Sequence, residues 1–136
     1  MRIAAYSVII AAGVVGLLGP AFAADMTGPE IKAFLTDKTV YLATTAASAS
    51  GQTGQGIIYW GRDGTALYKT PNGGMMHGKW EVKGNTNCTD WKERPGTGCV
   101  RYEKIGDTVS VIDAASGKAR AKIVKTSPGN AEKLAP

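Results

Sequence analysis

Histidine and cysteine are scarce in this chain of 136 residues, which has one histidine, His77, and two cysteines, Cys88 and Cys99. A Ser-His-Asp hydrolase would have to use His77 as its general base, and no Gly-x-Ser-x-Gly nucleophile elbow is present. One histidine offers haem at most one imidazole ligand, and the Cys-x-x-Cys-His attachment sequence is missing. We therefore predict neither a hydrolase of this class nor a haem, and no cofactor.

Runs of charge of one sign are also missing. The chain has 16 Lys and Arg against 11 Asp and Glu, a formal net charge of +5, and these residues are scattered along its length. A mild, dispersed charge is typical of a solvated surface, and no nucleic-acid recognition signature is present. We expect no nucleic-acid partner, while a weak attraction to anionic components of the cell envelope stays open.

The one long apolar run lies at the amino terminus. Residues 4–18 are almost wholly apolar, Arg2 precedes them and a Gly-Pro-Ala-Phe-Ala segment follows over 19–23. A cationic start, a short apolar stretch and a small-x-small ending make up a secretory signal peptide. The run is shorter than the roughly 20 residues of a bilayer span. We predict cleavage after Ala23, with a retained anchor as the alternative, and a periplasmic or secreted domain over 24–136 without a transmembrane span.

Export bears on the two cysteines, because both lie in the exported part of the chain. An oxidising compartment favours their pairing. Closing so short a loop stabilises a fold by about 3 kcal/mol in the chain-entropy model. We predict a disulfide between Cys88 and Cys99, the alternative being two buried thiols, and a paired cysteine is not a nucleophile.

One short helix is predicted at the start of the exported domain. Residues 27–30, Thr-Gly-Pro-Glu, form a capping box in which the Thr27 hydroxyl and the Glu30 carboxylate each satisfy a backbone N–H. Ile31, Phe34 and Leu35 then follow at the i, i+3, i+4 spacing of one helical face. We expect the helix to end at residues 36–37, after two to three turns, and to dock its apolar face on a sheet.

From Thr39 onward the apolar period changes to two, and Gly, Asn and Asp separate short β-rich runs. We predict strands around Val40 and Leu42 and over residues 56–61, 65–70, 78–83, 88–91, 99–104, 108–113 and 118–125. The last hairpin is predicted to face inward through Val109, Val111, Ala119, Ala121 and Ile123. Residues 46–56 are predicted as a mobile loop, 62–64 as a hairpin turn and 127–136 as a polar tail. One mainly β domain follows, an antiparallel meander that curls into a barrel or a sandwich.

Several short motifs stand in a recognisable order along nearly the whole exported part. They are Met26-Thr27-Gly28-Pro29-Glu30-Ile31, Tyr59-Trp60 with Asp63-Gly64-Thr65, Gly78-Lys79-Trp80, then Cys88, Trp91, Cys99 and Tyr102, and Pro128-Gly129-Asn130. In this order they resemble a family of small exported bacterial proteins of unknown function, from which Val100 departs because an aromatic residue is expected there. The resemblance implies a periplasmic location and transfers no catalytic residue.

Aromatic residues are concentrated in the middle of the chain. The set is Tyr59, Trp60, Tyr68, Trp80, Trp91 and Tyr102. Aromatic side chains commonly fill small β cores, but Tyr59 and Trp60 are adjacent and point to opposite faces of a strand, so one of them lies outside the core. We predict an aromatic surface or barrel mouth that binds an apolar ligand, a glycan or an envelope protein.

A Met75-Met76-His77 segment follows a glycine-rich turn, and thioether and imidazole ligands together suit copper. Neighbouring residues of a strand point to opposite faces, so these three could share one ion only from a loop. In the alternative interpretation the two methionines fill a gap at the edge of the core and His77 points to water.

Acidic residues are the last candidates for catalysis. Asp90 with Glu93 or Glu103 could converge near the disulfide and act in acid–base catalysis. The alternative is that these residues lie on a solvated face.

We favour a non-enzymatic exported binding protein. The second hypothesis is an inhibitor or accessory subunit of an envelope hydrolase that presents residues 92–98, anchored at both ends by the cysteines. An enzyme of unknown activity is the third.

Overall fold

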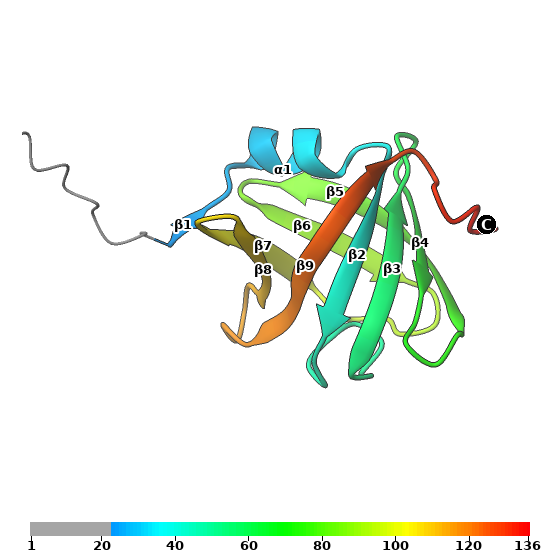
Figure 1. Ribbon diagram of the computed structural model, residues 1–136. Coiled ribbons are helices and arrows are strands. Elements are labelled where there is room, and N and C mark those ends of the chain that lie inside the picture. The colour runs from blue at the N-terminus through cyan, green and yellow to red at the C-terminus, as the bar shows by residue number, and fades with distance from the viewer. Residues whose placement is uncertain (1–22) are drawn as a thin grey trace, which may run out of the picture.

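The strands of this chain form one sheet that closes on itself. The computed structural model describes residues 23–136, so the predicted signal peptide, apart from Ala23, lies outside the described residues. Each strand from β2 to β9 pairs antiparallel with the next along the chain, and β9 pairs back with β2, which gives an eight-stranded closed barrel (Figure 1). The strands are β2 (Lys38–Thr44), β3 (Gly54–Trp60), β4 (Thr65–Lys69), β5 (Met75–Lys83), β6 (Thr86–Trp91), β7 (Cys99–Ile105), β8 (Thr108–Asp113) and β9 (Ala119–Pro128). The mainly β prediction is confirmed, and the barrel is the architecture formed.

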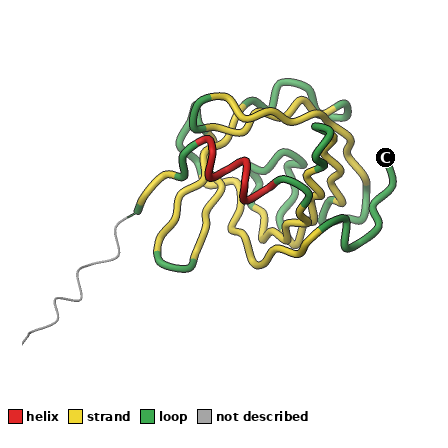
Figure 2. The backbone as a smooth tube through the Cα atoms, turned by 90° about the horizontal axis from the view of Figure 1, so that it is seen from above, coloured by secondary structure: helices red, strands yellow, loops and turns green. Residues whose placement is uncertain are grey.

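Helix α1 (Gly28–Leu35) covers one end of the barrel (Figure 2). The predicted capping box is present: Thr27 Oγ1 accepts from the Glu30 N–H at 3.3 Å, and Glu30 Oε1 accepts from the Thr27 N–H at 3.4 Å. Ile31 and Leu35 are fully buried, so the predicted apolar face does dock on the sheet. Within residues 23–136, no helix is long and apolar enough to span a membrane.

Gly28 allows the helix to approach the turn between β5 and β6. A β-carbon at this position would overlap the carbonyl oxygen of Gly84. The Gly28 N–H also donates to Asn85 Oδ1 at 2.9 Å, so the same turn satisfies a backbone group at the helix start.

The seam between β6 and β7 is short and is completed by the first residues of the described chain. These two strands pair at two positions, one of which is the predicted disulfide between Cys88 and Cys99, which is confirmed. Beyond it, strand β1 (Ala24–Asp25) pairs with the outer part of β7, and Met26 next to it is buried. The residues that follow the predicted cleavage site are therefore part of the sheet.

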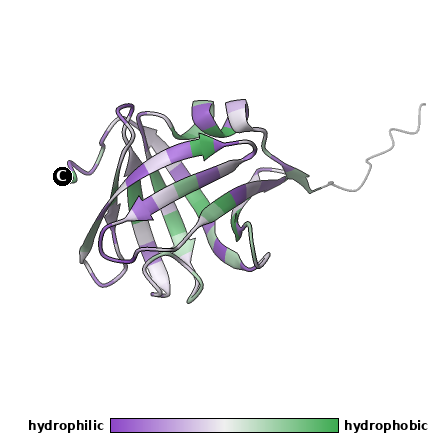
Figure 3. Ribbon diagram, turned by 180° about the vertical axis from the view of Figure 1, so that it is seen from behind, coloured by the Kyte–Doolittle hydropathy of each residue, from purple (hydrophilic) through white to green (hydrophobic). Residues whose placement is uncertain are grey.

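Inward-facing side chains fill most of the barrel interior, and hydrophilic and hydrophobic residues alternate along the strands (Figure 3). Aromatic rings form the centre of the core. Trp60 packs edge-on against Trp80 with ring centroids 5.5 Å apart and lies 6.4 Å from Trp91, which in turn lies 5.6 Å from Tyr68. These contacts pack the inner faces of β3, β4, β5 and β6 against one another.

One prediction about the last hairpin is wrong. Ala119 is exposed rather than inward-facing, and Arg120 is buried instead. The pairing register gives the reason, because Val111 pairs with Ala121 and Ile112 with Ala119, which leaves Arg120 without a partner on β8 as a β-bulge. The other four residues predicted to face inward do pack in the core.

The bounds of several predicted elements also differ, three of them most clearly. Strand β3 begins at Gly54, inside the loop predicted over 46–56, strand β5 begins at Met75 rather than Gly78, and β9 continues to Pro128. In each case the backbone ladder continues through residues without an alternating pattern, so the composition gave no sign of it.

The end of the chain is not simply the polar tail predicted over 127–136. Leu134 is buried, and both of its backbone polar groups are bonded to the Asn130 side chain at 2.9 Å. The Tyr41 hydroxyl donates to Glu132 Oε1 at 2.6 Å. These contacts fix the last residues against the outer face of β2.

Candidate functional site

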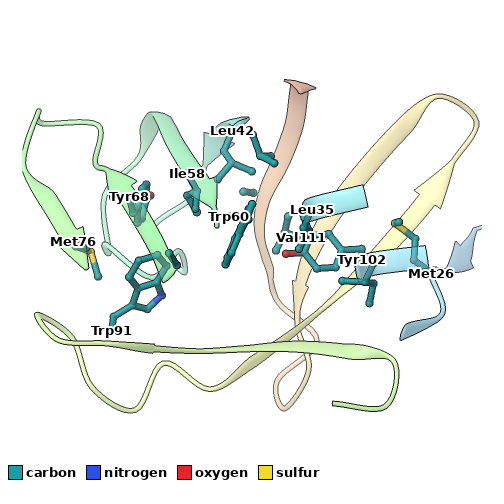
Figure 4. Close-up of a cluster of buried hydrophobic side chains, with 14 residues drawn as sticks. Met26, Leu35, Leu42, Ile58, Trp60, Tyr68, Met76, Trp91, Tyr102 and Val111 are labelled. Carbon is teal, nitrogen blue, oxygen red and sulfur yellow. The ribbon is translucent and has the colours of Figure 1, made fainter. Parts of the chain in front are cut away.

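A cavity of about 60 Å³ lies inside the barrel, between the aromatic core and the end opposite α1. Apolar side chains of several strands form most of its wall, among them Leu42, Ile58 and Val111. Polar side chains also reach it, which is unusual for the interior of a small barrel. Figure 4 shows how the buried side chains converge from opposite sides of the barrel.

Two loops form the mouth of this cavity. The β2–β3 loop contributes Ser48, and the β6–β7 loop contributes Thr97 and Gly98. The loops touch each other, because the Arg94 guanidinium lies directly against Gly51. The last two residues of the segment singled out over 92–98 therefore border the mouth.

Asn87 is the central polar residue of the cavity wall, and it is almost fully buried on β6. Its Nδ2 donates to the Tyr102 hydroxyl at 3.1 Å. Its Oδ1 has no hydrogen-bond partner among the described residues. Burial raises the pKa of Tyr102 to about 12, opposed by the bond from Asn87, so the hydroxyl keeps its proton. The pair therefore offers an amide acceptor and a hydroxyl donor at one place.

Arg120 occupies the mouth as a buried cation. Its Nε donates to Asp113 Oδ2 at 3.1 Å, and its Nη2 donates to Asp113 Oδ2 and to the Thr97 carbonyl. Backbone donation from Ser116 and the Arg120 guanidinium lower the pKa of Asp113 to about 2, so this pair stays ionised. The network ties the β6–β7 loop to the β8–β9 hairpin.

The aromatic residues predicted to bind a ligand are divided between two environments. Trp60, Tyr68, Trp91 and Tyr102 line the cavity. Trp80 packs behind Trp60, and its Nε1 donates to the Gly61 carbonyl at 2.9 Å. Figure 4 shows the four cavity residues inside the barrel.

Tyr59 points to the outer face, where its hydroxyl donates to Asp37 Oδ1 at 2.7 Å. Its neighbour Trp60 is buried, so the two residues face opposite sides as predicted. Tyr59 thus takes no part in the cavity.

The predicted copper ligands lie on strand β5 and not on a loop. Met76 is buried in the core, whereas His77 is half-buried on the other face, where its Nδ1 lies 2.7 Å from Glu93 Oε1. The strand therefore separates Met76 from Met75 and His77, and the structure does not bring the three together. In residues 23–136 no three His, Cys, Asp or Glu side chains are grouped to hold a metal ion.

The acidic residues considered for catalysis have different surroundings. Glu93 pairs with His77, whose hydrogen bonds lower the Glu93 pKa against the opposing effect of burial. Glu103 accepts from Arg101 at 2.9 Å, and Asp90 is exposed on β6. The structure does not assemble these carboxylates into one site.

Sequence reasoning singled out Thr97 only as part of the loop 92–98, and it missed the other polar residues of the cavity and its mouth, among them Asn87 and Arg120. For Asn87 a signal was present, because the period of two places it on the same face of β6 as Trp91. For Arg120 there was none, since the bulge reverses the alternation at that point.

Comparisons with protein families, curated proteins and solved structures find no match to this chain.

Proposed function

We propose that this protein is a non-enzymatic binding protein that holds a small, mostly apolar ligand inside its barrel. The observation that carries the proposal is the buried Asn87 amide in the cavity wall, whose Oδ1 has no partner among the described residues. The aromatic cluster by itself is also what a β core needs for packing. The polar groups are the distinctive part of the site.

The energetic argument concerns the cost of such an amide. A buried polar atom without a partner costs a fold about 1–3 kcal/mol, and an apolar residue at Asn87 would avoid that cost. A ligand that donates a hydrogen bond to Oδ1 offsets it. The Tyr102 O–H is also available, because that oxygen serves as acceptor in its bond with Asn87.

The width of the barrel interior agrees with this proposal. Eight-stranded barrels have an interior just wide enough for side chains or for one small ligand. The cavity of about 60 Å³ accommodates only a few heavy atoms. A ligand larger than that therefore has one end inside, near Asn87, and its other end at the mouth, between the loops that carry Ser48 and Thr97.

The test is a titration with hexan-1-ol, monitored by NMR of the protein over residues 24–136. We expect saturable shifts of the Asn87 side-chain amide and of the indole N–H of Trp91. The variant Ala121→Leu fills the cavity wall and should abolish them. Ala119→Leu is the matched control, because Ala119 is exposed on the same strand. Binding that is equal in both variants, or shifts confined to the outer face, would contradict the proposal.

A second candidate is the inhibitor of an envelope hydrolase. Residues 92–96 are all exposed, and the Cys88–Cys99 disulfide and the Glu93–His77 pair hold this loop in place. These features suit a stiff loop that enters an active-site cleft. Purified envelope hydrolases should then be inhibited by the wild type and not by a variant with alanine at Arg94 and Pro95. Inhibition that survives the alanine replacements would remove this candidate.

A further inference from the structure

At the mouth of the barrel, two neighbouring residues, Thr97 and Arg120, each keep a hydrogen-bond donor without a partner among the described residues. The bonds of Arg120 use Nε and Nη2, which leaves Nη1 free of a partner within residues 23–136. The buried Thr97 Oγ1 has no partner there either. The two residues touch, because the Arg120 guanidinium donates to the Thr97 carbonyl. Both residues line the inner cavity and also a groove of about 350 Å³ outside it.

The charges around this groove favour an anion. Arg94 and Arg120 line it, and Asp113 is the one acidic residue that does so. The groove therefore carries one positive charge in excess: Arg120 is paired with Asp113, and the exposed Arg94 has no acidic partner among the residues that line the groove. Arg94 thus attracts an anion to the groove, while the largely buried Arg120 supplies charge-assisted hydrogen-bond donors there.

We infer that the ligand of the barrel is a small monocarboxylate, whose carboxylate is bound by Arg120 Nη1 and Thr97 Oγ1 while its apolar part enters the cavity. This inference rests on the proposed function. Guanidinium and hydroxyl donors match the two oxygens of a carboxylate. A dianion would exceed the single positive charge in excess, and an amine would face a cation.

The bulge at Arg120 supports a role beyond tying loops together. In regular alternation Arg120 would point to solvent, where an ion pair contributes little to stability. The extra residue instead turns the guanidinium toward the cavity, next to Thr97. Bulges commonly redirect a side chain in this way next to functional sites.

The experiment compares hexanoate with hexan-1-ol by isothermal titration at pH 7, because the two probes share the same chain and differ in charge. We expect hexanoate to bind about tenfold more tightly or better, as charge-assisted hydrogen bonds imply. Thr97→Val removes only the unpartnered hydroxyl and should reduce this preference severalfold. Arg120→Gln should abolish the preference.

Two controls keep the result interpretable. Thr53→Val replaces an exposed threonine of the other loop and should leave the preference unchanged. Circular dichroism shows whether Arg120→Gln has folded, and Thr97→Val decides the question if it has not. Equal affinities for the two probes, or a Thr97→Val variant that keeps the full preference, would overturn the inference while the proposed function stands. Binding of neither probe would overturn both.

Discussion

Asn87 and Tyr102 share one hydrogen bond inside the barrel, from the Asn87 Nδ2 to the Tyr102 hydroxyl at 3.1 Å, and each keeps one polar capacity unused by that bond. On Asn87 it is the amide oxygen, and on Tyr102 it is the hydroxyl proton. Both side chains are almost fully buried, so neither is exposed enough to be solvated at the surface. Such a pair stabilises a core poorly. We therefore assign the free Asn87 oxygen and the free Tyr102 hydroxyl proton to hydrogen bonds with a ligand.

This assignment predicts opposite effects on stability and binding. The double variant Asn87→Leu/Tyr102→Phe replaces both polar groups with apolar groups of similar shape, which is close to neutral or stabilising. We expect its free energy of unfolding in urea to equal or exceed that of the wild type by up to about 1 kcal/mol. Tyr102→Phe alone should lower it by about 1 kcal/mol, since the Asn87 Nδ2 loses its acceptor. Binding of hexan-1-ol should weaken in both variants. A double variant that is much less stable than either single one would contradict the account.

Acid should protonate Asp113 and so weaken its ion pair with Arg120 at the mouth of the barrel. The folded-state pKa of this group, about 2, lies below its ordinary value, so its contribution to stability is complete above about pH 4 and is lost as pH falls toward 2. We expect Asp113 to contribute at most about 2 kcal/mol to the free energy of unfolding, because its side chain is only partly shielded from water. The measurement is the urea unfolding free energy of the wild type minus that of Asp113→Asn, from pH 6 to pH 2. Asp107→Asn, an exposed carboxylate in the β7–β8 turn, should give no such difference.

The disulfide should hold the mouth of the barrel in place as well as stabilise the fold. Replacing both Cys88 and Cys99 with alanine should lower the free energy of unfolding by about 3 kcal/mol, because the unfolded chain regains the freedom of the closed loop. Binding should weaken too, since Thr97 and Gly98 directly precede Cys99. Wild type treated with a reductant serves as the control and should match the variant. A variant with unchanged stability would show that the strand ladder alone fixes β6 to β7.

The close approach at Gly28 gives a prediction about the covered end of the barrel. Gly28→Ala places a β-carbon against the Gly84 carbonyl, and overpacking of this kind typically costs about 1–3 kcal/mol. Ala33→Gly, at an exposed position of α1, is the comparison and should cost about 1 kcal/mol through helix propensity alone. Thermal unfolding of both variants measures the difference. Gly28→Ala should leave the affinity for hexan-1-ol unchanged, because the ligand enters at the opposite end.

Local signals in the sequence sufficed for the helix, the disulfide and most strands. The Thr27–Glu30 capping box and the Cys88–Cys99 pairing act over a few residues, so residue type and spacing predict them. Closure is different, because it depends on β9 pairing with β2 some 80 residues earlier in the chain. No local pattern reports that pairing.

The candidate site was predictable only in part, and for a related reason. Trp60 and Trp91 were expected to belong to it because they are large and aromatic. The polar residues that make it distinctive depend on tertiary context: Arg120 turns inward through a bulge, and Thr97 sits where two loops meet. Conversely, the glycines at 73 and 74 indicated a loop before residue 78, although β5 already begins at Met75 and includes His77.

The most direct test of the central claim is native mass spectrometry of the protein purified from its own cells. The account predicts a species heavier than the disulfide-bonded chain by one small molecule, and the loss of that molecule in Ala121→Leu but not in Ala119→Leu. A wild type that carries no bound molecule, or one that Ala121→Leu retains in full, would contradict it.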